Sequence, residues 1–513
     1  MKAARLVLAA TIGLVGQVSF AASCEDLAKL RLPATTITSA QVVAAGAFKP
    51  PAESRAAARV SPRVYAGLPP FCRVMASATP TSDSDIRIEV WMPVSGWNGK
   101  YQAVGNGGWA GEIYYQDMAA ALAAGYATSG TDTGHVGNSA EFALGHPEKL
   151  VDFAHRAIHE MAVKSKAVIQ AHYGAAAKRS YFNGCSQGGR QGLTNAQRYP
   201  DDFNGIVAGA ASWNYLRSHA ARTAINLMVN RTPDSHIPAN KLPMVHNAML
   251  EMCDALDGVK DGIIENPTRC KFDPAMLQCK GADNPSCLTP AQVESAKALT
   301  SPLKHPTTGA ILFANHLWPG AELGWATLGG PKPLVNALTA MQNIVFKDRN
   351  WDWRTMNVAT DVDLTDKIDQ GLLASNNFDL KPFFDRGGKL LMWHGWADPQ
   401  VSPQNSITYF QNVLKTVGPA GANSVELFML PGVYHCRGGP GPDTFDRMSA
   451  IEQWVEHGKK PTRLVASGLK EGKTERTRPL CPYGQVAQYR GSGSTDEAAS
   501  FTCTPQAMDV TVR

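Results

Sequence analysis

A glycine-flanked serine constrains the fold of this chain more than any other feature: residues 184–188 read Gly-Cys-Ser-Gln-Gly. This stretch matches the G-x-S-x-G pattern, in which a serine occupies a strained turn between a strand and a helix. Residues 180–183 are predicted to form a strand before Ser186, and residues 190–199 a helix after it, which Pro200 ends. The pattern therefore predicts that Ser186 is a nucleophile at the end of a sheet strand.

Cysteines adjoin both Ser186 and a histidine near the C-terminal end, because Cys185 precedes Ser186 and Cys436 follows His435. If Ser186 and His435 form a nucleophile–base pair, their oxygen and nitrogen lie within hydrogen-bond reach. The two cysteines are then also brought within the Cα separation of several ångströms that a disulfide requires. This neighbourhood predicts a covalently braced site, formed in an oxidising compartment.

The order of the later motifs indicates which residue orients the base. Strand-like runs at 389–393 and 425–430 are followed by loops that contain Asp398 and His435, respectively. An acid and then a histidine after later strands is the chain order of α/β hydrolases. Taken singly, Asp398 is also compatible with an ordinary Asp-Pro turn and His435 with a packed loop histidine. Their joint order favours a Ser186–Asp398–His435 triad.

A second histidine, His394, competes for the role of base. It directly follows the strand-like run 389–393 and lies four residues before Asp398 in the same loop. Because His435 stands in the expected position after a later strand, we assign the base to His435. His394 is expected to line the substrate pocket.

An oxyanion hole needs two backbone N–H donors, one after the nucleophile and one from an early glycine-rich loop. Gln187 follows Ser186 and supplies the first donor. Gly107 or Gly108, in the loop after the strand-like run 101–104, is expected to supply the second. The alternative for these glycines is a plain turn.

Alternation of strand-like and helix-like segments up to about residue 210 predicts an α/β protein with a mainly parallel sheet. The alternation stops over residues 211–385, which are rich in Pro, Asn, Trp and Cys, and resumes after them. We therefore expect an α/β-hydrolase core in two parts, residues 22–210 and 386–513, with a lid domain at 211–385. The stretch from Pro461 is expected to be a short C-terminal arm.

The N-terminus, residues 1–21, has the features of a signal peptide: Lys2 and Arg5 precede an apolar run that ends near a small-x-small cleavage site at 19–21. The run is too short to span a membrane comfortably, and no later segment reaches that length. The net charge of +5 comes from scattered Lys and Arg residues, which argues against nucleic-acid binding. We expect a secreted or periplasmic protein.

All ten cysteines lie beyond the predicted cleavage site, and an even number in an exported chain indicates disulfides. Locality, together with the triad argument, favours five pairs: Cys24–Cys72, Cys185–Cys436, Cys253–Cys270, Cys279–Cys287 and Cys481–Cys503. The alternative for the group between Cys253 and Cys287 is zinc binding, but the C-x-x-C spacing typical of such sites is missing there.

Three carboxylates fall within eight residues in the predicted lid: Asp254, Asp257 and Asp261. Such crowding calls for a counter-ion, and hard oxygen ligands point to calcium. The spacing is not that of an EF-hand. The alternative is a solvated acidic turn.

These motifs together resemble the tannase and feruloyl esterase family. The resemblance rests on the sequence from Gly184 to Arg190, on the Asp398 loop and on His435-Cys436 followed by the glycine- and proline-rich stretch 438–442, and it spans nearly the whole mature chain. It implies an α/β hydrolase whose lid shapes the substrate pocket. It also implies that Asp254, Asp257 and Asp261, with the carbonyls of Val259 and Ile263, match a calcium site in the lid.

The expected function is a serine carboxylesterase that acts on small aromatic esters, such as feruloyl, galloyl or related hydroxycinnamoyl esters. Mono(2-hydroxyethyl) terephthalate hydrolases belong to the same family, so such esters are the alternative substrate. A non-catalytic binding protein on this scaffold is a further alternative, against which the intact apparent triad argues. Candidates for contacts to an aromatic acid are Phe346, Trp351, Trp353 and Arg354, although core packing also explains each of them.

Overall fold

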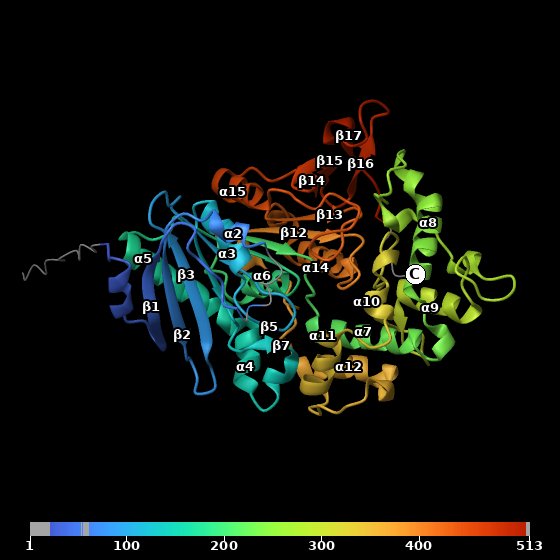
Figure 1. The fold of residues 1–513 in the computed structure, drawn as a ribbon, viewed down its shortest axis with the longest axis horizontal. Coiled ribbons are helices and arrows are strands. Elements are labelled where there is room, and N and C mark those ends of the chain that lie inside the picture. Colours follow the sequence, from blue (N-terminus) through green and yellow to red (C-terminus); the bar gives the residue numbers. More distant parts are fainter. Residues whose placement is uncertain (1–20, 53, 55–60, 509–513) are drawn as a thin grey trace, which may run out of the picture.

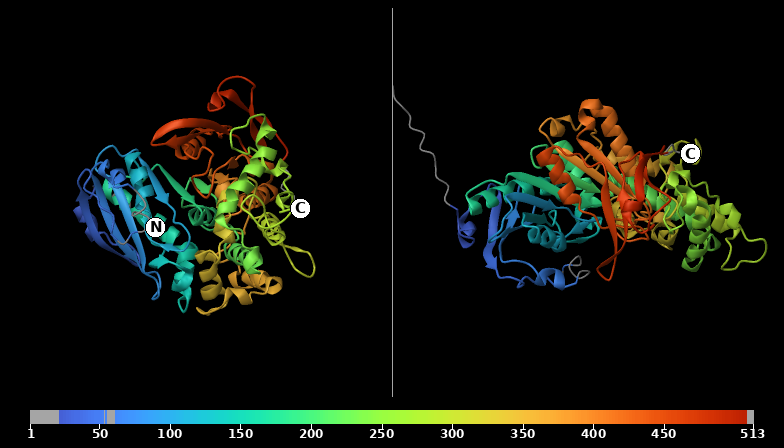
Figure 2. Two further views of the ribbon diagram at one scale, coloured as in Figure 1. Left: turned by 45° about the vertical axis from the view of Figure 1, so that its right-hand side comes forward. Right: turned by 90° about the horizontal axis from the view of Figure 1, so that it is seen from above.

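The structure of the protein is a computed structural model that describes residues 21–52, 54 and 61–508. The predicted signal peptide lies outside the described residues except for Ala21. The molecule is elongated, with the N-terminal strands at one end and the predicted lid at the other, as both Figure 1 and Figure 2 show. We call residues 211–385 the inserted segment; in the chain they lie between the sheet strands β9 (Gly205–Gly209) and β12 (Lys389–Gly395).

A nine-stranded sheet forms the centre of the molecule, in the order β1-β2-β3-β6-β4-β8-β9-β12-β13. The strands β1, β2, β3 and β6 pair antiparallel, and all neighbours from β6 to β13 pair parallel. Their bounds are β1 (Thr35–Val43), β2 (Phe71–Ala78), β3 (Ile86–Pro93), β4 (Lys100–Val104), β6 (Ala127–Thr131), β8 (Arg179–Cys185), β9 (Gly205–Gly209), β12 (Lys389–Gly395) and β13 (Val425–Leu430). The predicted α/β class with a mainly parallel sheet is confirmed.

Helices cover both faces of this sheet because its inner strands are apolar on both sides. Phe182 and Met392 pack with the helices of one face, whereas Tyr181 and Trp393 pack on the other, as the period of two along a strand requires. One face carries α5 (Ala157–Tyr173), α6 (Gln187–Arg198), α13 (Lys381–Phe384) and α14 (Pro403–Ala422), and the other carries α3 (Tyr115–Ala123) and α15 (Arg447–His457). Short elements near the sheet are α2 (Arg63–Ala66), α4 (Pro147–Val151) and the β5–β7 pair (Ala110–Gly111, Gly137–Asn138).

The inserted segment is mainly helical and has a core of its own. Ile225, Val245 and Trp325 pack together there, while Tyr215 and Leu216 on its first helix pack against Trp109 and other residues of the sheet domain. Its elements are α7 (Tyr215–Val229), α8 (Leu242–Cys253), α9 (Pro290–Thr300), α10 (Ala326–Gly329), α11 (Val335–Ala340), α12 (Val358–Asp369) and the pair β10–β11 (Leu303–Lys304, Ile311–Phe313). The helix α7 therefore belongs to both cores.

The chain after Pro461 is more regular than the predicted arm. It forms two hairpins, β14 (Leu464–Lys470) with β15 (Lys473–Leu480) and β16 (Gln485–Tyr489) with β17 (Phe501–Pro505). Figure 1 shows them at the top of the molecule, close to α8. The hairpins contact the acidic loop of the inserted segment, where Gln488 donates to the Asp257 carbonyl oxygen.

Five disulfides join the ten cysteines, and they are the five pairs expected from the sequence: Cys24–Cys72, Cys185–Cys436, Cys253–Cys270, Cys279–Cys287 and Cys481–Cys503. One element boundary differs from the prediction, because the helix after Ser186 begins at Gln187 and not at residue 190. The helix α5 is preceded by a π-helical turn at Asp152–Arg156. Among the described residues, the helices lack the combination of length and hydropathy that a bilayer-spanning helix needs.

Candidate active site

Ser186 occupies the tight turn between β8 and α6, with φ 63° and ψ −122°. Residues other than glycine rarely adopt this backbone conformation, which costs of order 1–3 kcal/mol and is typical of functional sites. A Cβ atom on Gly184 would lie 2.5 Å from the Gly188 carbonyl carbon, so the two flanking glycines permit the close approach of strand and helix. The turn lifts the Ser186 hydroxyl away from the sheet edge.

Ser186, His435 and Asp398 form one line of hydrogen bonds. The Ser186 Oγ atom lies 2.8 Å from His435 Nε2, and His435 Nδ1 lies 2.6 Å from Asp398 Oδ2. The three residues follow β8, β13 and β12, whose carboxyl ends share one edge of the sheet. With Nδ1–H donated to the carboxylate, the lone pair of Nε2 faces the serine hydroxyl, as a general base requires.

The Asp398 carboxylate is fully buried and accepts four hydrogen bonds. Oδ1 accepts from the N–H groups of Gln400 and Val401, and Oδ2 accepts from His394 and His435. Burial alone would raise its pKa, but the charge of His435 and the two histidine hydrogen bonds hold the Asp398 pKa well below its usual value. Asp398 is therefore ionised over the working range of an esterase.

His394 does not line the pocket, contrary to the expectation from the sequence. Its side chain is fully buried, with Nε2 3.1 Å from Asp398 Oδ2 and Nδ1 2.7 Å from Ser406 Oγ. The residue belongs to β12 itself, so its side chain points into the layer behind Asp398 and not into the solvent-filled space. Its contacts orient the carboxylate from the side opposite to His435.

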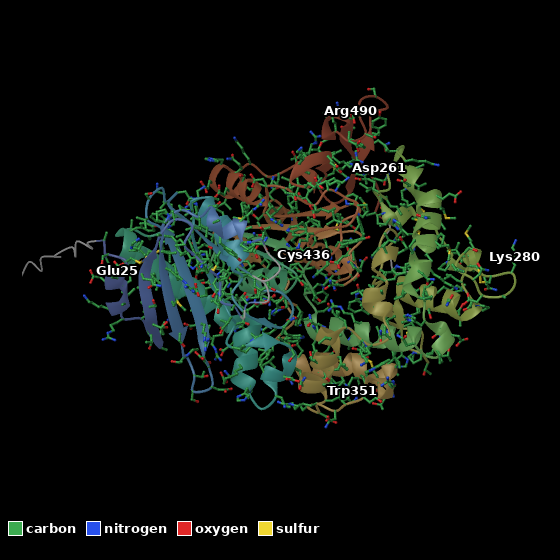
Figure 3. All side chains as sticks on the ribbon, viewed as in Figure 1. Glu25, Asp261, Lys280, Trp351, Cys436 and Arg490 are labelled. Atoms are coloured by element: carbon green, nitrogen blue, oxygen red, sulfur yellow. A yellow bond between two sulfur atoms is a disulfide. The ribbon has the colours of Figure 1, made fainter. Side chains whose placement is uncertain are left out.

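The Cys185–Cys436 disulfide lies beside this line of hydrogen bonds. The two Cα atoms are 6.0 Å apart, and the bond joins residues separated by 251 positions in the sequence. Because each cysteine neighbours one member of the Ser186–His435 pair, the disulfide ties the loop after β13 to the end of β8. Figure 3 shows Cys436 near the middle of the molecule, between the sheet domain and the inserted segment.

The backbone N–H groups of Gln187, Gly107 and Gly108 are the predicted oxyanion donors. Gly107, Gly108 and Ser186 line the same cavity, and Gln187 begins α6. Among the described residues, none of the recorded hydrogen bonds uses the N–H of Gly107, Gly108 or Gln187. Free N–H groups at a helix N-terminus and in a glycine-rich loop are suited to stabilise a developing oxyanion.

A cavity of about 730 Å³ opens onto Ser186 and His435. Its wall is shared between the inserted segment, the loop after β4, α3 and the loop after β13, with residues that include Gln116, Asp117, Tyr215, His219, Arg222, Leu334, Asn336, Arg437, Asp443 and Arg447. None of these ten residues belongs to a motif, so none is predictable from the sequence. They meet because the fold brings α3, α7, α11, α15 and the loop after β13 to one cavity.

The aromatic candidates named from the sequence are not among the residues that line this cavity. Phe346 and Trp351 stack on each other with ring centroids 4.4 Å apart, and Arg354 lies over Trp353 at 4.8 Å. Figure 3 places Trp351 at the outer edge of the molecule, far from Cys436. Phe346, Trp351 and Trp353 pack within the inserted segment, which was the alternative explanation for each of them, whereas the Arg354 side chain is exposed.

Figure 3 shows Asp261 of the acidic loop next to the C-terminal hairpins and away from Cys436, the neighbour of His435. Asp254 accepts hydrogen bonds from the N–H groups of Asp261 and Gly262, and Asp257 accepts from Val259. Asp261 pairs with the buried Arg478 of β15. Burial, with a smaller contribution from the charge of Asp254, raises the pKa of Asp257 to about 6.

In this arrangement the carboxylates of the loop are bound by backbone N–H groups and by Arg478 of the same chain. Across the described ranges, no three His, Cys, Asp or Glu side chains are grouped so as to hold a metal ion. The chemistry of the loop nevertheless fits a hard cation, since Arg478 pairs with only one of its three carboxylates, that of Asp261.

Comparison with known proteins agrees with the geometry. The profile of the family described as "Tannase and feruloyl esterase" matches residues 72–504. An uncharacterized esterase of Xanthomonas campestris pv. campestris is 36% identical, covering 97% of this chain and 93% of that protein. A probable feruloyl esterase B-1 of Aspergillus oryzae is 33% identical, covering 94% of this chain and 93% of that protein.

A solved structure shares the fold. The crystal structure of feruloyl esterase B from Aspergillus oryzae is 31% identical in sequence, covers 94% of this chain and 99% of that one, and superposes with a TM-score of 0.86. Both the family profile and these relatives extend over the sheet domain and the inserted segment. The chain therefore belongs to the tannase and feruloyl esterase family and is a carboxylic ester hydrolase.

Proposed function

We propose that this enzyme is a serine esterase that hydrolyses esters of aromatic acids through a covalent acyl-enzyme. The observation that carries the proposal is the line of hydrogen bonds from Ser186 Oγ through His435 to the buried Asp398 carboxylate. The line ends in a cavity of about 730 Å³, a volume typical of small-molecule sites. A nucleophile, an oriented base and N–H donors in one cavity make acyl transfer the reaction class that fits best.

In the proposed reaction, His435 takes the Ser186 proton as Oγ attacks the ester carbonyl carbon. Asp398 holds His435 in the required tautomer and stabilises the imidazolium that forms. The N–H of Gln187 and that of Gly107 or Gly108 bind the oxyanion. His435 then protonates the leaving alcohol, and a water molecule, activated by the same histidine, releases the acid and restores Ser186.

Feruloyl or galloyl esters are the proposed substrates. The description of the family and the names of the relatives refer to tannase and feruloyl esterases, and therefore favour these esters over terephthalate monoesters. The wall of the cavity carries Tyr215 and Leu334 beside polar groups such as His219 and Asn336. Such a mixture suits an aromatic ring that bears hydroxyl groups. A rate comparison of methyl ferulate, methyl gallate and mono(2-hydroxyethyl) terephthalate tests this order of preference.

The test of the catalytic assignment is a Ser186→Ala variant. We expect its kcat on methyl ferulate to fall by a factor of about 10⁴ or more, because the nucleophile is lost. A fluorophosphonate probe should label the parent at Ser186 and leave the variant unlabelled. The control is Ser449→Ala, an exposed serine on α15, which should retain both activity and labelling. Hydrolysis by Ser186→Ala at the parent rate contradicts the proposal.

We further propose that the enzyme is exported. Support comes from the signal-peptide features of residues 1–21 and from the five disulfides, which persist in oxidising compartments. Mass spectrometry of the protein recovered from the medium or periplasm should find a mature N-terminus at Ala22. Recovery of the full-length chain in the cytoplasm with reduced cysteines is the opposite result.

Calcium is proposed as a structural ion of the inserted segment. The ligands would be the carboxylates of Asp254, Asp257 and Asp261 and the carbonyl oxygens of Val259 and Ile263. Support comes from the excess of negative charge in a partly buried loop and from the raised pKa of Asp257, because both mean that a cation would stabilise the folded state. The test is the effect of a chelator on the melting temperature and on the rate.

A further inference from the structure

The carbonyl group of Gly108 is held from the inserted segment. Tyr215, the first residue of α7, donates its phenolic hydroxyl to Gly108 O at 2.9 Å. The neighbouring Trp109 donates its indole N–H to the carbonyl oxygen of Asn336 in α11 at 3.0 Å. The glycine-rich loop of the sheet domain is thus attached to two helices that come from the inserted segment.

This loop needs outside support because it contains three glycines, Gly105, Gly107 and Gly108, within four residues. Glycine samples both signs of φ, and Gly108 itself has φ 54°, so the sequence of the loop does not fix the direction of its N–H groups. Within the loop, Asn106 anchors its side chain to the carbonyls of Glu112 and Thr131. On one side of Gly108, the Gly107 carbonyl accepts from the Ala110 N–H, which holds the peptide that carries the Gly108 N–H. On the other side, the Tyr215 hydroxyl holds the Gly108 carbonyl.

The aromatic rings behind the loop leave Tyr215 little freedom. Trp109 is fully buried, and its ring centroid lies 4.9 Å from that of Tyr215 and 4.7 Å from that of Phe153. His135 Nε2 lies 2.8 Å from the Trp109 carbonyl oxygen and completes the support. The Tyr215 hydroxyl is therefore held by packed rings at the position where it meets Gly108.

Gln187, the other proposed oxyanion donor, is held by residues that contact Tyr215. Arg190, fully buried on α6, donates its Nε–H to the Gln187 side chain at 2.7 Å and an Nη1–H to the Leu373 carbonyl at 2.9 Å. Its guanidinium lies 5.3 Å from the ring centroid of Tyr215. Gln187 and Gly108 are thus held from behind by two side chains that contact each other.

We propose that Tyr215 is a positioning residue for the oxyanion hole: its hydroxyl holds the Gly108 carbonyl, which limits rotation of the backbone about Gly108 and keeps the Gly108 N–H in place. The helix α7 thereby contributes to the chemical step. This inference rests on the proposed serine-esterase mechanism. It predicts that loss of the hydroxyl weakens binding of the charged transition state and leaves binding of the neutral ester nearly unchanged, because only the developing oxyanion uses the N–H groups of the loop.

The test is Tyr215→Phe, which removes one oxygen atom and keeps the packed ring. We expect kcat on methyl ferulate to fall about ten- to hundredfold, as for a misplacement of about an ångström, with KM changed less than about twofold. An arylboronic acid, which forms a tetrahedral anion on the serine, should bind more weakly by the same factor as the loss in kcat/KM. The affinity for ferulate, the product, should stay within about twofold of the parent value.

The matched control is Tyr173→Phe, which deletes a phenol that donates to the Pro93 carbonyl at 2.7 Å on α5, away from the cavity. It should leave kcat, KM and boronate affinity at the parent values. Tyr215→Phe with parent-like kcat and boronate affinity overturns the proposal. Equal weakening of boronate and ferulate binding also overturns it, because that pattern means general disruption of the cavity. In both cases an inactive Ser186→Ala leaves the proposed function standing, whereas an active Ser186→Ala removes the function itself.

Discussion

His394 lies directly behind Asp398, with its Nε2 atom 3.1 Å from the carboxylate oxygen Oδ2. The same oxygen accepts the hydrogen bond from His435. Since Nε2 of His394 faces two acceptors, Asp398 Oδ2 and the Val401 carbonyl, this atom carries the hydrogen, and Nδ1 accepts from the Ser406 hydroxyl. The buried Asp398 is therefore oriented by one histidine on each side, of which only His435 reaches the nucleophile.

His394→Phe should lower kcat without changing KM. The variant removes one of the four donors to Asp398, so the carboxylate gains freedom to rotate and His435 is held less well. We expect a loss of about tenfold in kcat on methyl ferulate, smaller than the factor of about 10⁴ that loss of a triad acid costs. Ser406→Ala, which removes only the partner of Nδ1, is the milder comparison and should lose less. A parent-like kcat for His394→Phe would show that Asp398 is held by its other donors alone.

Loss of the Cys185–Cys436 disulfide should lower activity more than it lowers the melting temperature. Without the bond, the loop after β13 can shift relative to Ser186, and a displacement of about an ångström can cost roughly a hundredfold in rate. The control pair is Cys279→Ala with Cys287→Ala, which removes a half-buried disulfide of the inserted segment that closes only a short loop. Activity and thermal unfolding of both double variants decide the matter; a parallel loss of rate and fold in the Cys185–Cys436 variant contradicts the expectation.

The motifs around Ser186, Asp398 and His435 were predictable because each follows a strand that can be recognised from its run of apolar residues. The strand 425–430 was predicted with the bounds that the structure has, since all six of its residues are buried. The start of α6 was placed three residues late, because Gly188 and Gly189 in its first turn have low helix propensity. The edge strand β1 was not predicted, since none of its residues is fully buried and its composition gives no alternation.

The cavity wall was beyond reach of the sequence for a different reason. Tyr215 contacts Gly108 across the boundary between the inserted segment and the sheet domain, and Arg190 donates to the Leu373 carbonyl, 183 positions away in the sequence. Contacts between residues so far apart leave no local signal. Buried arginines are rare, so a residue such as Arg190 is read as a surface residue unless the fold is known. Aromatic residues such as Trp351, by contrast, suggested a pocket but pack on one another.

Protonation of His135 should destabilise the enzyme in acid. Burial lowers the pKa of His135 from 6.5 to about 4, so the folded state binds fewer protons than the unfolded state between these values. The stability contributed by unprotonated His135 is therefore present above pH 6.5 and is lost as the pH falls from 6.5 toward 4. At about 1.4 kcal/mol per pKa unit, the loss is on the order of 3 kcal/mol.

His135→Gln keeps a donor for the Trp109 carbonyl but removes the titrating ring. Its melting temperature should fall less steeply than that of the parent between pH 6.5 and pH 4, with the slope above pH 6.5 unchanged. Some decline will remain, because burial also lowers the pKa of His155 to about 4. Parallel melting curves for parent and variant across this range would exclude His135 as the source of the acid sensitivity.

Removal of calcium should unfold the enzyme at lower temperature without an immediate loss of rate. The acidic loop contacts β15 and β16 and lies away from the cavity, so an ion there stabilises the folded state by mass action, by about 2.7 kcal/mol at a hundred times its dissociation constant. A chelator should therefore lower the melting temperature of the parent and have no such effect on Asp257→Ala. The matched control is Asp348→Ala, because Asp348 accepts the N–H two residues onward in an exposed turn, as Asp257 does from Val259. That variant should keep the full response to the chelator. An unchanged melting curve with immediate loss of turnover would place the ion at the catalytic centre, and no response in either measurement would mean that Arg478 alone closes the loop.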